Sequence, residues 1–157
     1  MNRGFNCKTE FGEIYIEENG YAITRLNFVK NKEIIEVKIE ETNLIRETVK
    51  QLDEYFRGDR KTFNILLAPK GTEFQIKVWE ELKKIKYGET KSYKEIADKI
   101  GNEKGARAVG GANNKNPILI LIPCHRVIAS SGDLSGYAGG IKIKKKLLEM
   151  ENKHKSS

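Results

Sequence analysis

Residues 118–128 read ILILIPCHRVI, and this stretch decides how the second half of the chain folds. Its first five residues are the longest apolar run in the sequence, too short to span a membrane and suited to a buried core. Pro123 favours an extended conformation at the residue before it and stiffens the approach to Cys124. We therefore expect Cys124 at the base of a dry pocket, followed directly by His125 and Arg126.

A cysteine beside a histidine has three interpretations: a nucleophile with its base, a pair of metal ligands, or chance adjacency. Side chains of neighbouring residues in an extended chain point to opposite sides, so Cys124 and His125 are not expected to touch. A bridging water could carry the proton, and a carboxylate behind His125 would hold its tautomer. Arg126 is permanently charged and can fix flanking backbone or a carboxylate in place. The four-residue motif alone leaves these interpretations open.

The sequence before this stretch predicts three helices. The first spans about 72–88 and carries its apolar side chains on one face. Ser92 is placed to cap a short second helix that Gly101 ends, and Asn102 to cap a third over 103–113. Two short helices joined by a turn that contains glycine, the second rich in small residues, are typical of a helix-turn-helix.

The charge of the chain favours a polyanionic partner. Its net charge is +7, from 29 Lys and Arg against 22 Asp and Glu. The basic excess lies mainly after Gly71, so we expect the second half to face DNA; this half closes with an amphipathic helix over 143–151. No apolar leader follows Met1, which predicts a cytoplasmic protein (nuclear in a eukaryote) without membrane attachment.

The two cysteines, Cys7 and Cys124, lie far apart, and we expect no disulfide between them in a reducing compartment. Together with His125 and His154 they show no spacing typical of zinc sites, so we expect no metal and no cofactor. Cys7 lies in a short strand-like segment and is interpreted as a buried, inert thiol.

The first half predicts a small sheet with one helix. Asn19-Gly20 has the composition of a two-residue hairpin turn, and residues 31–33 could form a looser one. Thr42 or Asn43 can cap a helix with apolar spacing that ends near Gly58. The expected strands are 11–18, 21–29, 34–40 and 61–67. We therefore predict an α+β fold with domains at 1–70 and 71–157, separated near the Ala68-Pro69-Lys70-Gly71 linker.

Several motifs, in order and with compatible spacing, resemble one family. They are Arg107 to Ala112 (RAVGGA), Asn116-Pro117, Pro123 to Arg126 (PCHR), Ser131-Gly132 and Tyr137 to Gly140 (YAGG). Residues 72–151 resemble the O6-alkylguanine-DNA alkyltransferases. The first 70 residues are similar only in outline to that family's ribonuclease H-like N-terminal layout. The resemblance implies a mostly helical C-terminal domain whose helix-turn-helix is winged-helix-like.

The resemblance implies a reaction that consumes the protein. Cys124 would take an alkyl group from O6-alkylguanine in duplex DNA irreversibly, so each molecule would act once; O4-alkylthymine remains an open substrate. His125 would deprotonate the thiol through water, Glu151 would orient His125, and Asn116 would bond the backbone on both sides of the turn. Tyr93 would crowd the target phosphate and donate a proton to the departing base.

A base inside a duplex must be flipped out to reach a buried thiol, and Arg107 would take its place in the stack. The other expected DNA contacts are Tyr93, Ser92, Ala106, Gly110 and Arg126. The expected substrate pocket consists of Tyr137, Ala138, Gly139, Val127 and Trp79, with the carbonyls of Cys124 and Val127 reading the guanine edge. Two positions depart from the family: Ala138 replaces a serine of many members, and polar Asn113 replaces a bulky apolar residue found in some.

Three other functions stay as alternatives. A binding-only alkylguanine-recognition protein would have another residue in place of Cys124. A helix-turn-helix regulator would not need a thiol in this rigid setting, and a cysteine hydrolase would need an oxyanion hole. We expect double-stranded DNA with alkylated guanine as the partner and a monomeric protein, with cooperative binding along DNA left open.

Overall fold

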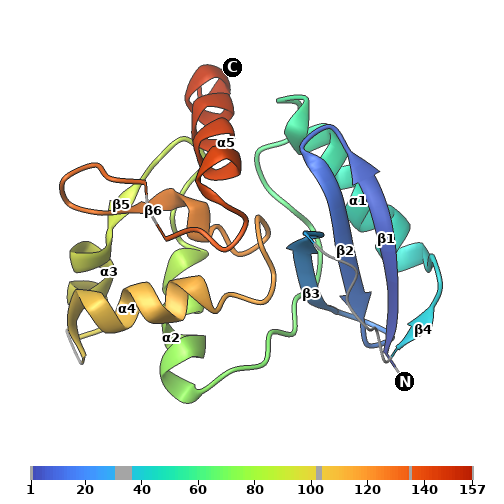
Figure 1. Ribbon diagram of the computed structural model, residues 1–157, viewed down its shortest axis with the longest axis horizontal. Coiled ribbons are helices and arrows are strands. Elements are labelled where there is room, and N and C mark those ends of the chain that lie inside the picture. The colour runs from blue at the N-terminus through green and yellow to red at the C-terminus, as the bar shows by residue number, and fades with distance from the viewer. Residues whose placement is uncertain (1, 31–36, 102–103, 135, 157) are drawn as a thin grey trace. The chain divides into compact units, whose positions relative to one another are not determined.

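The computed structural model describes residues 2–30, 37–101, 104–134 and 136–156. The chain divides into two compact units, Met1–Pro69 and Lys70–Ser157, each described here by itself. The fold is α+β: a sheet with one helix forms the first unit, and helices dominate the second (Figure 1).

In the described part of the first unit, four strands form one sheet in the order β3-β2-β1-β4. The strands are β1 (Arg3–Thr9), β2 (Gly12–Glu18), β3 (Ile23–Phe28) and β4 (Lys38–Ile39), with β1, β2 and β3 antiparallel and β4 parallel to β1. Helix α1 (Asn43–Phe56) packs on β1 and β2 (Figure 1), and the Thr42 side chain accepts a hydrogen bond from the backbone N–H of Ile45 as its N-cap. The core between sheet and helix includes Ile14, Ile16, Ile45, Leu52 and Tyr55.

The hairpin prediction at Asn19-Gly20 was right about the pairing of β2 with β3 and wrong about the turn. Glu18 pairs with Ile23, so four residues connect the strands. The Asn19 side-chain oxygen accepts hydrogen bonds from the backbone N–H groups of Tyr21 and Ala22, at 3.2 and 3.0 Å. An asparagine that bonds its own following backbone stabilises this wider turn over a two-residue one.

Three other strand predictions need correction. Residues 3–9 form a full strand, whereas the prediction was only a short strand-like segment around Cys7. The strand predicted at 61–67 is reduced to one bridge between Leu67 and Ile23. The strand predicted at 34–40 is seen only as Lys38–Ile39; residues 34–36, and the turn predicted at 31–33, lie outside the described residues.

The second unit contains α2 (Glu73–Leu82), β5 (Lys91–Ser92), α3 (Tyr93–Lys99), α4 (Gly105–Asn114), the 3-10 turn η1 (Cys124–Arg126), β6 (Val127–Ile128) and α5 (Ile141–His154). Thr72 and Ser92 cap α2 and α3 through reciprocal capping boxes, each closed by a Gln or Glu three residues later. Helix α2 is shorter than predicted, and α5 is longer. Helix α4 begins after Lys104, whereas Asn102, predicted as its cap, lies outside the described residues.

Helices α2, α3 and α4 pack against one another, and the β5–β6 pair ties the start of α3 to the segment after Cys124 (Figure 1). Lys91 pairs with Val127 and Ser92 with Ile128 in parallel register. This pairing holds the helix-turn-helix beside the predicted nucleophile.

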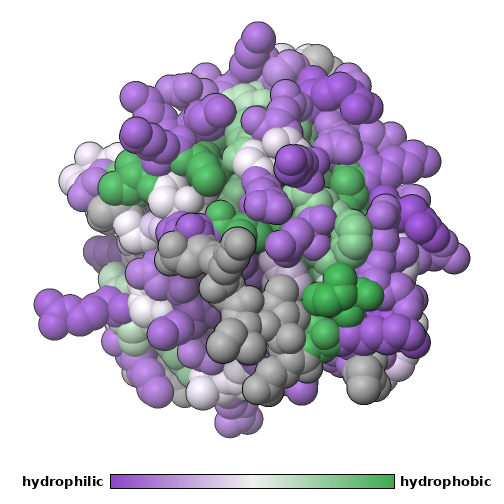
Figure 2. All heavy atoms as spheres, turned by 45° about the vertical axis from the view of Figure 1, so that its right-hand side comes forward, coloured by the Kyte–Doolittle hydropathy of each residue, from purple (hydrophilic) through white to green (hydrophobic). Residues whose placement is uncertain are grey.

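The face drawn in Figure 2 is mostly hydrophilic, interrupted by separate hydrophobic side chains. Across the described residues, no helix combines the length and apolar character that crossing a membrane requires.

Candidate active site around Cys124

The apolar run before Cys124 folds into tight turns. The backbone N–H of Leu121 donates to the carbonyl of Leu119 at 2.8 Å, which places Ile120 at a φ of 70°. The N–H of Cys124 donates to the carbonyl of Ile122 at 2.8 Å around Pro123 (φ −79°, ψ 62°). Both are three-residue turns, and the first is the rarer and more strained form. A β-branched residue at positive φ needs its surroundings to hold it there.

Asn116 supplies part of that support. Its side-chain amide N–H donates to the carbonyl of Ile122 at 2.8 Å, and its side-chain oxygen accepts from the N–H of Ile118 at 3.0 Å. The residue is buried, so neither bond is replaced readily by water. One side chain thus bonds the backbone at both ends of the run, the geometry expected of a hinge.

The predicted nucleophile, its predicted base and the predicted orienting carboxylate form a buried cluster. Cys124, His125 and Glu151 are 1%, 0% and 1% exposed. His125 Nε2 and Glu151 Oε2 are 2.7 Å apart. Glu151 Oε1 also accepts the backbone N–H of Gly88 at 3.1 Å, which anchors the carboxylate to the chain after α2.

Arg126 holds the same carboxylate and is only 7% exposed, a placement that does not fit its predicted contact with DNA. Its Nε and Nη2 donate to the two oxygens of Glu151 at 2.9 and 3.0 Å, and its Nη1 donates to the carbonyl of Ile85 at 2.8 Å. Bidentate guanidinium–carboxylate pairing is strong and geometrically specific. Arg126 therefore fixes the Glu151 carboxylate in place, which is one of the two roles that its permanent charge suggested.

The electrostatics of the cluster fix its charge states. Burial raises the pKa of Glu151, but hydrogen bonds and charges from His125 and Arg126 outweigh it and lower that pKa to about 2. Burial lowers the pKa of His125 more than Glu151 raises it. Burial raises the pKa of the Cys124 thiol to about 11, with Asn116 and then Lys144 acting in the opposite direction. At neutral pH the carboxylate is charged and the imidazole neutral.

An ionised carboxylate can only accept, so the neutral imidazole donates its Nε2–H to Glu151. The lone pair then lies on Nδ1, and this ring nitrogen is the one that can receive a proton. Because η1 is a helical turn, the Cys124–His125 geometry is not the strand alternation assumed from the sequence. The His125–Glu151 pair fits the predicted base and its orienting carboxylate, and Cys124 precedes this histidine in the chain.

Tyr93 lies between α4 and the loop after β6. A Cβ on Gly110 would lie 3.8 Å from its ring, and one on Gly136 would lie 3.3 Å from its hydroxyl. Burial, then Cys124, then Asp133 raise the pKa of this phenol, which keeps it protonated. Tyr93 is thus close enough to Cys124 for the cysteine to raise the pKa of the phenol. The tyrosine ring packs against Gly110.

Helix α4 exposes Arg107 among small residues. Ala106 and Gly111 are exposed beside it and Gly110 is half-buried, whereas Val109 is fully buried on the opposite face. Among the described residues, Arg107 has no hydrogen-bonding or ion-pair partner, so its guanidinium is available to a ligand. Small residues flanking an exposed arginine allow the helix backbone to come close to a partner.

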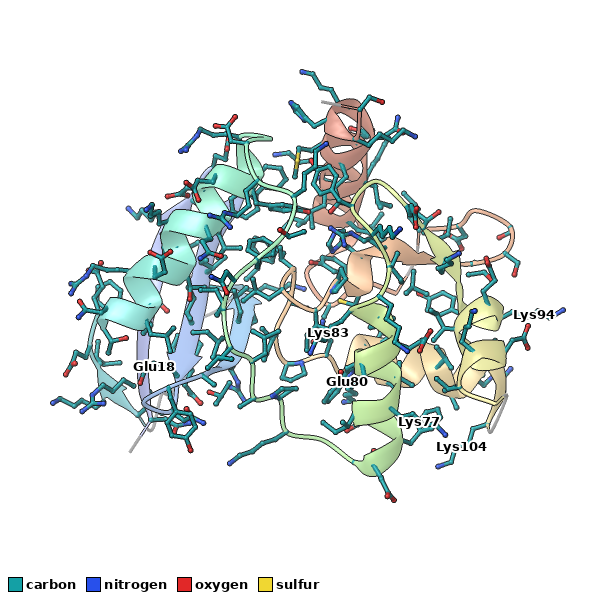
Figure 3. All side chains as sticks on the ribbon, turned by 180° about the vertical axis from the view of Figure 1, so that it is seen from behind. Glu18, Lys77, Glu80, Lys83, Lys94 and Lys104 are labelled. Carbon is teal, nitrogen blue, oxygen red and sulfur yellow. The ribbon has the colours of Figure 1, made fainter. Side chains whose placement is uncertain are left out.

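A basic groove of about 770 Å³ borders the same helix. Lys77 of α2, Lys104 and Lys115 line it, and Lys104 Nζ lies 5.0 Å from the centre of the Phe74 ring. Figure 3 shows the Lys77 and Lys104 side chains near one another. These three lysines outnumber the acidic Glu73 of the lining, so the groove has the positive charge that favours a nucleic acid.

The predicted pocket residues differ in their placement. Tyr137 is buried, Gly139 is buried and Ala138 is exposed. Trp79 is 1% exposed and its Nε1 donates to the carbonyl of Ala112 at 2.9 Å. Trp79 therefore joins α2 to α4 as a packing residue, and its place in the substrate pocket stays a prediction.

The sequence did not predict the buried contacts of two polar residues, Asn113, which was noted only as a departure from the family, and Lys144. Asn113 donates from its side-chain amide to the carbonyl of Cys124 at 3.4 Å, and Lys144 Nζ donates to the carbonyl of Val127 at 2.7 Å. Both carbonyls were predicted to read the base. The signal for Lys144 was its helical spacing with Leu147 and Glu151, which places a lysine on the buried stripe of α5.

Fold and site together define a small α+β protein whose helix-turn-helix half carries a buried cysteine followed by a histidine that is bonded to a buried carboxylate. The chain belongs to the 6-O-methylguanine DNA methyltransferase family: that family's DNA binding domain matches residues 73–153 and its ribonuclease-like domain matches residues 6–69.

Individual proteins agree over nearly the whole chain. A methylated-DNA--protein-cysteine methyltransferase of Methanosarcina acetivorans is 49% identical over 147 residues, which cover 92% of this chain and 94% of that protein. A constitutive protein of the same name from Bacillus subtilis is 45% identical over 158 residues, covering 96% of each chain. The crystal structure of Mycobacterium tuberculosis OGT in complex with DNA matches with a TM-score of 0.90 at 41% identity, over 97% of this chain and 94% of that one.

Proposed function

We propose that this protein repairs DNA by direct reversal, transferring one methyl or other alkyl group from the O6 of guanine in duplex DNA to Cys124. The observation that carries the proposal is the buried thiol beside the His125–Glu151 pair, in a chain of this family. Relatives that share 45–49% of their residues over nearly the full length are named for this activity.

The transfer begins with proton movement. The Cys124 proton passes through a water molecule to His125 Nδ1, and Glu151, bonded to Nε2, stabilises the imidazolium that forms. The sulfur attacks the alkyl carbon as the bond from that carbon to O6 breaks, and the electron pair leaves with guanine. Tyr93 donates a proton to the departing base. Because a thioether has no easy leaving group, the protein is consumed in one turnover.

The base reaches the thiol by flipping out of the duplex. Exposed Arg107 on α4 fills the vacated place in the stack, and Ala106, Gly110 and Ser92 lie close to the DNA backbone. The carbonyls of Cys124 and Val127 keep a second lone pair beyond their bonds to Asn113 and Lys144, so each can still accept from the guanine edge. The backbone at Tyr137, Ala138 and Gly139 completes the pocket.

Other expectations stay predictions: the monomeric state, cooperative binding on DNA, the cytoplasmic location, and independent domains at 1–70 and 71–157. They do not bear on the chemistry at Cys124.

The test is an intact-mass measurement after incubation with a duplex that contains one O6-methylguanine. We expect one added methyl on Cys124, and repair that stops at one equivalent of DNA. Cys124→Ala should bind the duplex and gain no mass, whereas Cys7→Ala, which removes the other thiol, should react like the unaltered protein. Sustained turnover, or unchanged mass with the lesion intact, contradicts the proposal; unchanged mass with tight binding would favour a recognition protein.

A further inference from the structure

Asn113 is a buried asparagine whose side-chain oxygen the proposed mechanism does not use. The residue lies near the end of α4 and is 1% exposed. Its Nδ2 donates to the carbonyl of Cys124 at 3.4 Å, a long hydrogen bond. Because a carbonyl oxygen accepts only from a donor, this contact determines which way the amide faces. The nitrogen lies toward Cys124, and Oδ1 is directed away from that carbonyl.

Oδ1 of Asn113 is a buried acceptor without a hydrogen-bond donor among the described residues. Two side-chain donors of the same unit are engaged elsewhere. Trp79 Nε1 donates to the carbonyl of Ala112 at 2.9 Å. Asn116 Nδ2 donates to the carbonyl of Ile122 at 2.8 Å. Native interiors leave few buried polar atoms unpaired, because each of them costs stability. In a pocket, such an atom indicates an acceptor that a ligand satisfies.

The place of this acceptor follows from the residue to which Asn113 is bonded. Cys124 is itself 1% exposed, so a base reaches its sulfur only when the pocket around it opens. Asn113 contacts the backbone carbonyl of the same residue that carries the sulfur. An opening that brings the alkyl carbon to Sγ of Cys124 therefore brings the edge of the base toward the Asn113 amide.

An O6-alkylguanine base has a single N–H donor group, its 2-amino group. Alkylation of O6 leaves N1 without a hydrogen, N9 is bonded to the sugar, and N3 and N7 only accept. In O4-alkylthymine the ring nitrogen N3 has likewise lost its hydrogen, so that base has no N–H donor. In the minor groove the 2-amino group is also the donor that distinguishes G·C from A·T pairs. An unpaired acceptor in the base pocket therefore suits the alkylated purine and not the alkylated pyrimidine.

We propose that Asn113 is a specificity-determining residue whose Oδ1 accepts a hydrogen bond from the 2-amino group of the flipped alkylguanine. This inference rests on the proposed function, which brings the base into the pocket. The second N–H of the amino group remains for the carbonyl of Cys124 or Val127. A base without the amino group leaves Oδ1 buried and unpaired, and it should react about ten- to a hundredfold more slowly.

The first experiment compares two duplexes that differ only in this amino group. One contains O6-methylguanine and the other O6-methylhypoxanthine, the same base without its 2-amino group, each opposite cytosine. Single-turnover rates of methyl transfer are measured for the unaltered protein and for Asn113→Leu, which keeps the approximate size of the side chain and removes the acceptor. Asn114→Leu is the matched control, because Asn114 is the exposed neighbour on α4.

We expect the unaltered protein to react about ten- to a hundredfold faster with the guanine duplex than with the hypoxanthine duplex. In Asn113→Leu the ratio of the two rates should fall about tenfold, mainly through a slower reaction with the guanine duplex. Asn114→Leu should keep the ratio of the unaltered protein. A purely structural role, or a buried water at Oδ1, would change both rates by the same factor. A folded Asn113→Leu protein with an unchanged ratio therefore overturns the proposal, and so does a ratio near one in the unaltered protein.

A second measurement requires neither methyl transfer nor a stable Asn113→Leu protein. The affinities of Cys124→Ala for the two duplexes are compared with those of Cys124→Ala/Asn113→Ala, since alanine is well tolerated within a helix. Cys124→Ala should prefer the guanine duplex about tenfold, and the double variant should lose that preference. An equal preference in the two proteins overturns the inference. If Asn113 governs the preference but no methyl transfer occurs, the proposed repair function fails and the recognition of the amino group stands.

Discussion

Replacing Glu151 by Gln removes one charge from the centre of the site while keeping its shape. Glu151 is bonded to His125, Arg126 and the backbone of Gly88, all within 3.1 Å. A glutamine has one accepting oxygen in place of two. Its NH₂ group would therefore face an N–H donor of His125 or Arg126. Glu151→Gln should therefore reduce both stability and transfer.

The magnitude follows from the pKa of the carboxyl group. Its value falls from 4.5 to about 2 on folding. Each pKa unit corresponds to about 1.4 kcal/mol, so the charged carboxylate stabilises the fold by roughly 3 kcal/mol. Because the folded pKa is depressed, this stabilisation is complete above the unfolded value and is lost as the pH falls from 4.5 toward about 2.

The assay is urea unfolding of the unaltered protein and of Glu151→Gln at several pH values. At neutral pH the variant should be less stable by roughly 3 kcal/mol, and the gap should close in acid as the native carboxylate is protonated. Glu149→Gln, at an exposed position of the same helix, should change stability by less than about 0.5 kcal/mol. Equal stability at neutral pH, or a gap that does not narrow in acid, refutes the reasoning.

Three further predictions concern the turn, the helix and the product. Asn116→Ala leaves two buried backbone groups without their partners and should lower the unfolding free energy by about 3 kcal/mol in urea titration; a loss below about 1 kcal/mol contradicts the hinge. Arg107→Ala should slow repair of duplex DNA more than reaction with a free modified base, measured as single-turnover rates; equal slowing would remove Arg107 from base flipping. Methylation of Cys124, 1% exposed, should lower the melting temperature by an amount equivalent to about 1–3 kcal/mol in calorimetry, and an unchanged value contradicts tight packing there.

Local features of the fold were predictable because their causes lie within a few residues. Thr72 and Ser92 cap their helices through bonds to residues three positions later, which the sequence displays directly. The turn at residues 118–122 was not predictable in this way. Five apolar residues fit a strand as well as a turn, and Ile120 reaches its positive φ only within the bonds that Asn116 makes at both ends.

In the candidate site too, the sequence predicted some residues, whereas contacts between distant parts of the chain were not predictable. The motifs that resemble the family predicted Cys124 as the nucleophile and His125 as its base, but they did not show that Arg126 and the backbone of Gly88 both hold the Glu151 carboxylate. Arg126 was expected at DNA and instead binds Glu151, 25 positions along the chain. The burial of Lys144 also depends on groups from other elements, since a lysine on a helix is ordinarily assigned to solvent. Long-range charge compensation is the part that residue types alone do not encode.

The proposed single use of Cys124 follows from how tightly its side chain is enclosed. In the resting protein the thiol is neutral, because burial raises its pKa to about 11, and its proton leaves only when the transfer begins. Alkylation adds a group where only 1% of the residue is exposed. The product then holds a side chain larger than its space, which is unfavourable in a packed interior. Returning the alkyl group would require breaking a carbon–sulfur bond, and among the described residues of the site we identify no second nucleophile that could do so. The packing that encloses the thiol before the reaction is thus the reason that the reacted protein is a less stable one.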